Sequence, residues 1–98
     1  MIYVLATIKA LTGQTRALIA GARSCIDATR KEDGCLSYDY VQDTEDPDKL
    51  VVVERWSSRA ALDAHLKTPH LADWRQVRKP LIESTRVEII EPARVETL

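Results

Sequence analysis

The run LVVVERW, which ends at Trp56, constrains the fold more than any other stretch of the sequence. Its β-branched residues favour an extended strand, which we expect over Lys49–Trp56. The acidic segment Asp43–Asp48 comes just before it and has the composition of a turn, and Cys35–Gln42 alternates like another strand. Two strands joined by a turn predict a β-hairpin in the middle of the chain.

Two more strands and one helix are predicted around the hairpin. Ile2–Lys9 alternates with apolar residues on both faces, and Thr85–Ile90 alternates near the end of the chain. Between the first strand and the hairpin, Thr12 is a suitable N-cap and Gly34 a suitable helix end. Apolar and small residues recur in this segment at helical spacing and predict the inward face of a helix; they are Leu18, Ile19, Ala22, Cys25, Ile26 and Thr29. The polar run Arg30–Asp33 is expected to be exposed to solvent.

The second helical region is predicted to break in two. Ser57 or Ser58 caps a first helix whose inner face carries Leu62, His65 and Leu66. Thr68-Pro69 then starts a second helix, because Thr is an N-cap residue and Pro suits the first helical position. The inward residues predicted for this second helix are Leu71, Trp74, Val77 and Leu81. Pro80 ends or bends it.

The predicted order of elements is β-α-β-β-α-β, the ferredoxin-like arrangement within the α+β class. The 98 residues form a single domain, residues 1–98, with an antiparallel four-stranded sheet and helices on one face. The other face has nothing in the chain to cover it. Five apolar strand residues are expected to need such a cover: Ile2, Val4, Ile8, Val51 and Val53. We therefore expect a homodimer in which two sheets pack face to face.

Composition and charge exclude several classes of protein. With a formal net charge of -1, the chain has no excess of positive charge that would attract the phosphates of nucleic acid. No apolar run is long enough to span a membrane, and the apolar N-terminus lacks the basic start of a signal peptide, so we expect a cytoplasmic protein. Cys25 and Cys35 fit reduced thiols in that compartment. No Cys/His cluster has zinc spacing and no glycine-rich loop suits a nucleotide, so no metal or other cofactor is expected.

His65 and His70 are the only histidines and the first candidates for chemistry. On one unbroken helix, residues five apart diverge by about 140°, but the break at Thr68-Pro69 removes that constraint. His65 shares its predicted inner face with Leu62, so we expect it to point inward. An inward imidazole titrates near neutral pH and can act as a base. It can equally be a core histidine satisfied by one hydrogen bond.

Glu54, Trp56 and Tyr38 are the other residues of interest on the predicted hairpin. Glu54 lies on an otherwise apolar strand face, so it is expected to be buried and paired, for example with an arginine. Trp56 closes the same strand and is either core or a wall of a binding site. Tyr38 either donates a hydrogen bond to a ligand oxygen or is a half-buried strand residue.

The segment VVVERWSSRAALDAHLKTPHLADW closely resembles the antibiotic biosynthesis monooxygenase (ABM) domain family, in its small bacterial quinol-monooxygenase-like branch. The shared elements are Glu54 with Trp56 at the strand end, then Leu62, then His65 and the triplet Thr68-Pro69-His70. The stretches MIYVLATIKALTGQ and KEDGCLSYDYVQD resemble the family too. The resemblance therefore covers nearly the whole chain.

The resemblance implies a dimeric α+β barrel with a pocket between the sheet and the helices of each subunit. It also implies a cofactor-independent monooxygenase that acts on a quinol or phenolic polycyclic substrate with O2. Such a protein supplies a dry pocket, a base and donors that hold an oxyanion. The implied catalytic residues are His65, as the base, and His70. The implied substrate-binding residues are Trp56, Tyr38, Thr7, Leu62 and Trp74.

Several family positions differ in this chain, which narrows the expected function. Haem-degrading members place an Asn where this chain has Thr7, an axial His near Arg75 and a Trp near His65, so haem degradation is not expected. A polyketide oxygenase of the family has an Asn where Val52 stands. The histidine pattern also occurs in an isomerase of the family. The alternatives are therefore an isomerase of a small hydroxy-ketone signalling metabolite and a non-catalytic small-molecule-binding or stress-response module.

Overall fold

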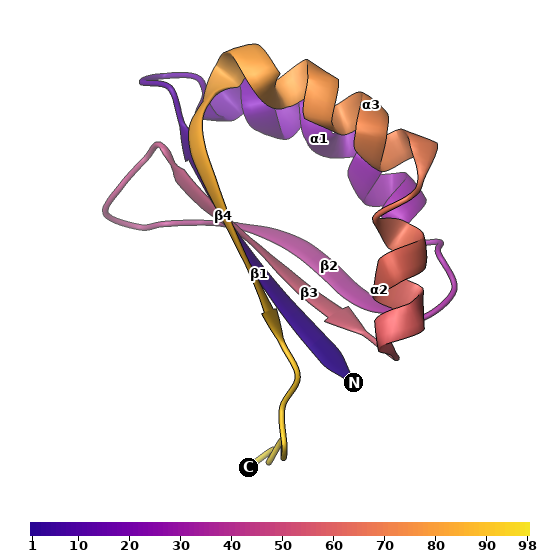
Figure 1. Cartoon of the computed structure of the whole chain (residues 1–98). Coiled ribbons are helices and arrows are strands. Elements are labelled where there is room, and N and C mark those ends of the chain that lie inside the picture. The colour runs from indigo at the N-terminus through magenta and orange to yellow at the C-terminus, as the bar shows by residue number, and fades with distance from the viewer.

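Four strands form one antiparallel sheet in the computed structural model, which describes residues 1–98. The strands are β1 (Ile2–Ala10), β2 (Cys35–Gln42), β3 (Lys49–Trp56) and β4 (Ile82–Ile90), in the sheet order β2-β3-β1-β4. The helices are α1 (Thr15–Thr29), α2 (Arg59–His65) and α3 (Pro69–Arg78), followed by the short 3-10 helix η1 (Lys79–Leu81). They lie on one side of the sheet, with α1 and α3 next to each other (Figure 1). The predicted ferredoxin-like α+β fold is confirmed.

The strand register decides which side chains face the helices. Successive residues of a strand point to opposite faces, so a shift of one residue exchanges the two sets. Ile2, Val4 and Ile8 are buried in the core beneath the helices. The expectation that these three need a cover from outside the subunit is therefore wrong. Of the five residues in that expectation, only Val51 and Val53 alternate with the buried positions of β3, and both are half-buried on the open face.

Helix α1 starts later than predicted, because the chain before it is tied to the hairpin turn. Gly13 has φ +77°, and its N–H donates to Asp48 Oδ1 at 3.1 Å. The hydroxyl of Thr15 donates to the Pro47 carbonyl oxygen at 2.7 Å. Thr12 consequently belongs to the turn, and Gln14 takes the N-cap position without a side-chain cap. Contacts between distant segments thus override the local capping signal.

The predicted break between the second and third helices is confirmed. Ser58 is the N-cap of α2, and its hydroxyl oxygen accepts a hydrogen bond from the N–H of Ala61 at 3.1 Å. Thr68 precedes α3, which begins at Pro69 as expected. The His65 carbonyl oxygen at the end of α2 accepts from both the hydroxyl of Thr68, at 2.8 Å, and its N–H, at 3.1 Å.

The inward faces of the helices are only partly as predicted. Leu62, Leu71 and Trp74 are buried in the core, whereas Ile19, Leu66 and Val77 are exposed. Strand β4 begins at Ile82, three residues before the predicted start, and directly follows η1. Both cysteines are free thiols, as expected.

None of the helices has the length and apolar character that crossing a membrane requires.

Gly34 has a different role from the predicted one of ending α1, which stops at Thr29. Its φ is +81°, and a Cβ at this position would lie 2.6 Å from both Ser57 Oγ and Ala61 Cβ. Its carbonyl oxygen also accepts a hydrogen bond from the Ser57 N–H at 2.8 Å. The missing side chain therefore lets the start of β2 pack directly against the start of α2.

We predict that Gly34→Ala lowers the free energy of unfolding by about 2–4 kcal/mol. The left-handed backbone conformation costs Ala about 1–2 kcal/mol, and the new methyl group collides with the start of α2. Gly13→Ala is the matched control, because Gly13 has φ +77° but no atom within 4 Å of its Cβ position. Urea denaturation of both variants measures the difference. Equal losses would contradict the close approach at Gly34.

Candidate active site

A pocket of about 60 Å³ lies between the sheet and the helices α2 and α3. Its wall is mostly apolar and includes Val4, Ala6, Val52, Leu62 and Leu71. The polar residues that line it are Tyr38, Tyr40, Glu54, His65, Arg75 and Arg78. Ligand pockets usually enclose about 300–1,000 Å³, so a ring-sized ligand has to displace side chains in order to enter. The exposed members of the lining form the edge that such a ligand meets first; they are Leu66, Arg75, Val87 and Ile89.

His65 is buried, and one of its two ring nitrogens is fixed by a carboxylate. Its Nδ1 lies 2.7 Å from Oε2 of Glu32. Because a carboxylate can only accept, Nδ1 carries the hydrogen and donates it, which leaves Nε2 as the basic nitrogen. Nε2 makes no hydrogen bond within the protein. Burial lowers the pKa of His65 below its ordinary value of 6.5, and the Glu32 carboxylate only partly offsets this. The imidazole is therefore neutral at neutral pH.

His70 donates to the same oxygen of Glu32. Its Nε2 lies 2.8 Å from Oε2, so one carboxylate oxygen accepts from both imidazoles. His70 does not line the pocket; it borders a groove between α1 and α3, together with Cys25 and Asp73. The helix break at Thr68-Pro69 allows the two rings to approach to 6.3 Å between their centroids.

Glu32 is the functional candidate that sequence reasoning missed. The run Arg30–Asp33 was expected to be solvated, but the Glu32 side chain is only 14% exposed. It connects α1 to β2 and reaches α2 and α3 through the two histidines. The sequence offers only an indirect signal, which is that two imidazoles at a helix break need a nearby acceptor.

Glu32, His65 and His70 also have the composition of a metal-binding set. They offer one ligand atom each, and these atoms lie within 4.8 Å of one another. Two imidazoles and a carboxylate suit divalent transition metals. The arrangement described here is nevertheless a pair of hydrogen bonds, since Oε2 itself lies at donor–acceptor distance from both nitrogens.

Glu54 is buried as predicted, but its expected arginine partner is wrong. Its Oε1 accepts a hydrogen bond from the indole N–H of Trp56 at 3.0 Å. The two residues are two apart on β3 and so lie on the same face of the strand. Burial raises the pKa of Glu54 to about 7, although the Trp56 N–H lowers it. Glu54 is therefore largely protonated in mildly acidic solution.

Tyr38 and Tyr40 stand side by side on β2, with ring centroids 5.9 Å apart. Burial raises the pKa of Tyr38, and it raises that of Tyr40 to about 12, so both are neutral hydroxyls at neutral pH. The Tyr38 ring meets the His65 ring edge-on at 5.7 Å. The pair therefore places hydroxyl donors beside the candidate base.

The structure brings together four of the seven predicted site residues as pocket lining: Tyr38, Leu62, His65 and Trp74. Trp56 is fully enclosed behind His65, with ring centroids 4.7 Å apart, and does not line the pocket. Thr7 lies opposite Val51 and Arg86, between the pocket residues Ala6 and Ile8. Strand alternation therefore turns its side chain to the other face of the sheet.

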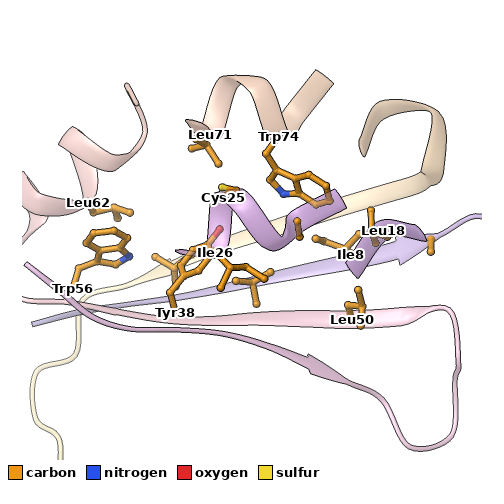
Figure 2. Close-up of a cluster of buried hydrophobic side chains, with 14 of the residues drawn as sticks. Ile8, Leu18, Cys25, Ile26, Tyr38, Leu50, Trp56, Leu62, Leu71 and Trp74 are labelled. Carbon is orange, nitrogen blue, oxygen red and sulfur yellow. The ribbon is translucent and has the colours of Figure 1, made fainter. Parts of the chain in front are cut away.

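The core in Figure 2 shows how these aromatic residues are arranged. Trp56 lies under Leu62 at one end of the cluster, and the indole of Trp74 reaches from α3 toward the sheet. Tyr38 rises from the sheet between them. Pocket and core are therefore continuous, because the same residues belong to both.

The family model for antibiotic biosynthesis monooxygenases matches residues 1–77. The chain belongs to the antibiotic biosynthesis monooxygenase family. The "Putative monooxygenase Rv0793" of Mycobacterium tuberculosis is 42% identical over 77 residues, which are 78% of this chain and 75% of the relative. The "Probable quinol monooxygenase YgiN" of Escherichia coli is 29% identical over 102 residues, covering 94% of this chain and 98% of the relative.

Solved structures of other proteins have the same fold. The structure of Rv0793 from Mycobacterium tuberculosis superimposes with a TM-score of 0.87 at 32% identity and covers 98% of both chains. A structure from Deinococcus radiodurans described as a "putative antibiotic biosynthesis monooxygenase" gives a TM-score of 0.91 at 24% identity, over 100% of this chain and 98% of that chain. The fold predicted from the pattern of strands and helices is thus the fold of the family.

We predict that Glu54→Gln stabilises the protein much more in alkaline solution than in acid. A carboxyl whose pKa is raised from 4.5 to about 7 on folding loses stability as the pH rises through that window. Glutamine keeps an acceptor for Trp56 but never ionises. The gain in unfolding free energy is expected to be at most about 3 kcal/mol at pH 8.5 and about 1 kcal/mol or less at pH 5. Urea denaturation at the two pH values measures it, and a gain independent of pH would contradict burial as its cause.

Proposed function

We propose that this protein is a cofactor-independent monooxygenase that oxidises a quinol or a phenolic polycyclic compound with O2. One observation carries the proposal. His65 lines an apolar pocket with its Nδ1 fixed by Glu32, so that the basic Nε2 is left for a ligand. The family and the relative named as a quinol monooxygenase support the reaction class.

The proposed mechanism begins with a proton transfer to His65. A substrate hydroxyl gives its proton to Nε2, and the Glu32 carboxylate stabilises the imidazolium that forms. The electron-rich anion passes one electron to O2, and the resulting radical pair combines to a peroxide on the ring. Loss of water then leaves one oxygen atom on the ring, so that quinol and O2 become hydroxyquinone and water. The electrons come from the substrate itself.

The pocket walls suit the other demands of this reaction. Apolar side chains exclude water, which strengthens each hydrogen bond made inside. The neutral hydroxyls of Tyr38 and Tyr40 provide donors toward a developing oxyanion. His70 lies behind Glu32 and is assigned a positioning role, since it holds the carboxylate that orients His65.

We predict that His65→Ala lowers turnover of a true quinol substrate by about 10²–10⁴-fold, the usual contribution of a general base. The wild-type rate is expected to rise with pH through the pKa of His65, which lies below 6.5, and then to level off. An oxygen electrode with 2-methyl-1,4-naphthoquinol measures this after subtraction of uncatalysed oxidation. Metal chelator added to the assay is expected to change nothing. Near-normal turnover in His65→Ala would return this residue to a packing role.

Glu32→Gln provides a test of the orientation of His65. We predict a loss of turnover of about tenfold or more, because the amide stabilises the imidazolium less than a carboxylate does. The acidic limb of the pH profile is expected to move to lower pH, since Glu32 raises the pKa of His65. His70→Ala is expected to lose less than His65→Ala. An unchanged pH profile in Glu32→Gln would show that the carboxylate has only a structural role.

Anaerobic assays separate this proposal from the alternatives. The same base could serve an isomerase, because moving a proton next to a carbonyl needs a neutral imidazole and hydroxyl donors. An isomerase converts a hydroxy-ketone under nitrogen, whereas the proposed monooxygenase is inactive without O2. A non-catalytic binding module does neither, and replacing its histidines changes no turnover.

We also infer that the protein is a homodimer whose open sheet faces pack together. Leu5, Val51 and Val53 lie on that face, with no element of the chain above them. Val41 lies opposite Val51 and is 45% exposed. A face with this apolar centre is stabilised by a second copy of itself, as in an isologous dimer.

We predict that Val53→Lys dissociates the homodimer, because it places a charge at the centre of the face-to-face contact. Val77→Lys is the control, since Val77 is 50% exposed in the helix layer. Sedimentation equilibrium at micromolar concentration is expected to give a dimer for wild type and Val77→Lys and a monomer for Val53→Lys. A stable wild-type monomer would overturn the inference.

A further inference from the structure

The face of α3 that lines the pocket changes from apolar to basic along the helix. Leu71, Trp74, Arg75 and Arg78 all line the pocket, and their spacing is that of a single helical stripe. A helix that only packs against a sheet has apolar residues along such a stripe. Here the last turn instead contributes two arginines to the pocket lining.

Neither Arg75 nor Arg78 has a carboxylate partner. Other arginines form ion pairs, such as Arg23 with Asp27 and Arg30 with Asp39. Burial lowers the pKa of Arg78 and the positive charge of Arg75 lowers it further, whereas the nearby Tyr40, Tyr38 and Cys25 partly offset this. Arg75 is exposed and Arg78 is half-buried. The two like charges at this edge of the pocket are therefore uncompensated.

Trp74 adds an unpaired donor to the same face of α3. Its side chain is buried, with 2% of the residue exposed, and its Nε1 has no hydrogen-bond partner. The N–H is close enough to the Tyr40 hydroxyl to influence its pKa, but it does not reach hydrogen-bonding geometry with it. An unsatisfied buried N–H costs about 1–3 kcal/mol, so a ligand that accepts from it binds more tightly.

We propose that the pocket binds an anionic substrate, in which an oxyanion group such as a carboxylate or phosphate lies between Arg75, Arg78 and the N–H of Trp74. The inference rests on the proposed function in that the same pocket holds the substrate. The apolar wall receives the ring system, and the end of α3 receives the charge. The only carboxyl group in the lining, Glu54, is engaged by Trp56 on the opposite wall.

The competing explanation is that the two arginines only stabilise the end of α3. Basic residues in the last turn interact favourably with the helix dipole, and both arginines lie there. That explanation accounts for charge at the helix end, but it leaves the unpaired N–H of Trp74 and the inward position of Arg78 unexplained. The two explanations differ in whether a ligand's charge matters.

Isothermal titration calorimetry with redox-inert probes tests the proposal. The probes are 1-hydroxy-2-naphthoate, its neutral methyl ester, and 1-naphthyl phosphate with 1-naphthol as its neutral counterpart. We expect each anion to bind at least about tenfold more tightly than its neutral counterpart. A hydrogen bond to a charged group contributes a binding free energy that corresponds to at least this change in Kd. Comparison of the two anions shows whether the subsite prefers a carboxylate or a phosphate.

Matched variants locate the effect. Arg78→Gln is expected to raise the Kd of the anions about tenfold and to leave that of the neutral probes within about twofold. Trp74→Phe keeps the ring, removes the N–H, and is expected to weaken anion binding as well. Lys79→Gln is the control, because Lys79 is exposed at the same helix end, outside the pocket. Equal affinity for charged and neutral probes, or equal effects of Arg78→Gln and Lys79→Gln, overturns the proposal, as does failure of every probe to bind.

The outcomes also separate this proposal from the proposed function. If 2-methyl-1,4-naphthoquinol is oxidised with O2 but anions gain no affinity from Arg78, the monooxygenase proposal stands and the anion subsite falls. If the anions bind in an Arg78-dependent way but no quinol, charged or neutral, consumes O2, the anion subsite stands and the monooxygenase proposal falls.

Discussion

A single carboxylate oxygen, Oε2 of Glu32, holds together the three segments that build the site. It accepts from His65 at the end of α2 and from His70 at the start of α3, and Glu32 itself lies in the connection from α1 to β2. Hydrogen bonds with a charged acceptor are about twice as strong as neutral ones, and these are largely shielded from water. Without this carboxylate, two imidazole N–H groups would lose their acceptor.

Burial shifts the pKa values of His65 and Glu54, which both line the pocket, in opposite directions. It lowers the pKa of His65 and raises that of Glu54 to about 7, because in each case it disfavours the charged form. Both groups can therefore be uncharged near neutral pH, which suits an apolar pocket. The fixed positive charge then comes from Arg75 and Arg78 at the end of α3. The proposed base is thus contributed by α2 and the proposed anion-binding groups by α3.

Much of the fold could be predicted because its signals are local. The alternation of β1, the β-branched run of β3 and the helix break at Thr68-Pro69 all act over a few residues, and each was found where it was predicted. The errors arose where distant contacts override local preference. Thr12 lost its capping role to the hairpin turn, and Gly34 serves the packing of β2 against α2 instead of ending α1.

The same contrast between local sequence signals and distant contacts holds for the candidate site. The sequence pattern by itself determined that His65 points inward and that Glu54 is buried on an apolar strand face. The pocket between sheet and helices was expected from the family resemblance. Only the tertiary structure decided that Glu32 binds both histidines, across separations of 33 and 38 residues. Only it decided that Thr7 faces away from the pocket and that the Trp74 N–H stays unpaired. The physical reason is that periodicity fixes the face of an element, whereas hydrogen-bond partners depend on how whole elements pack.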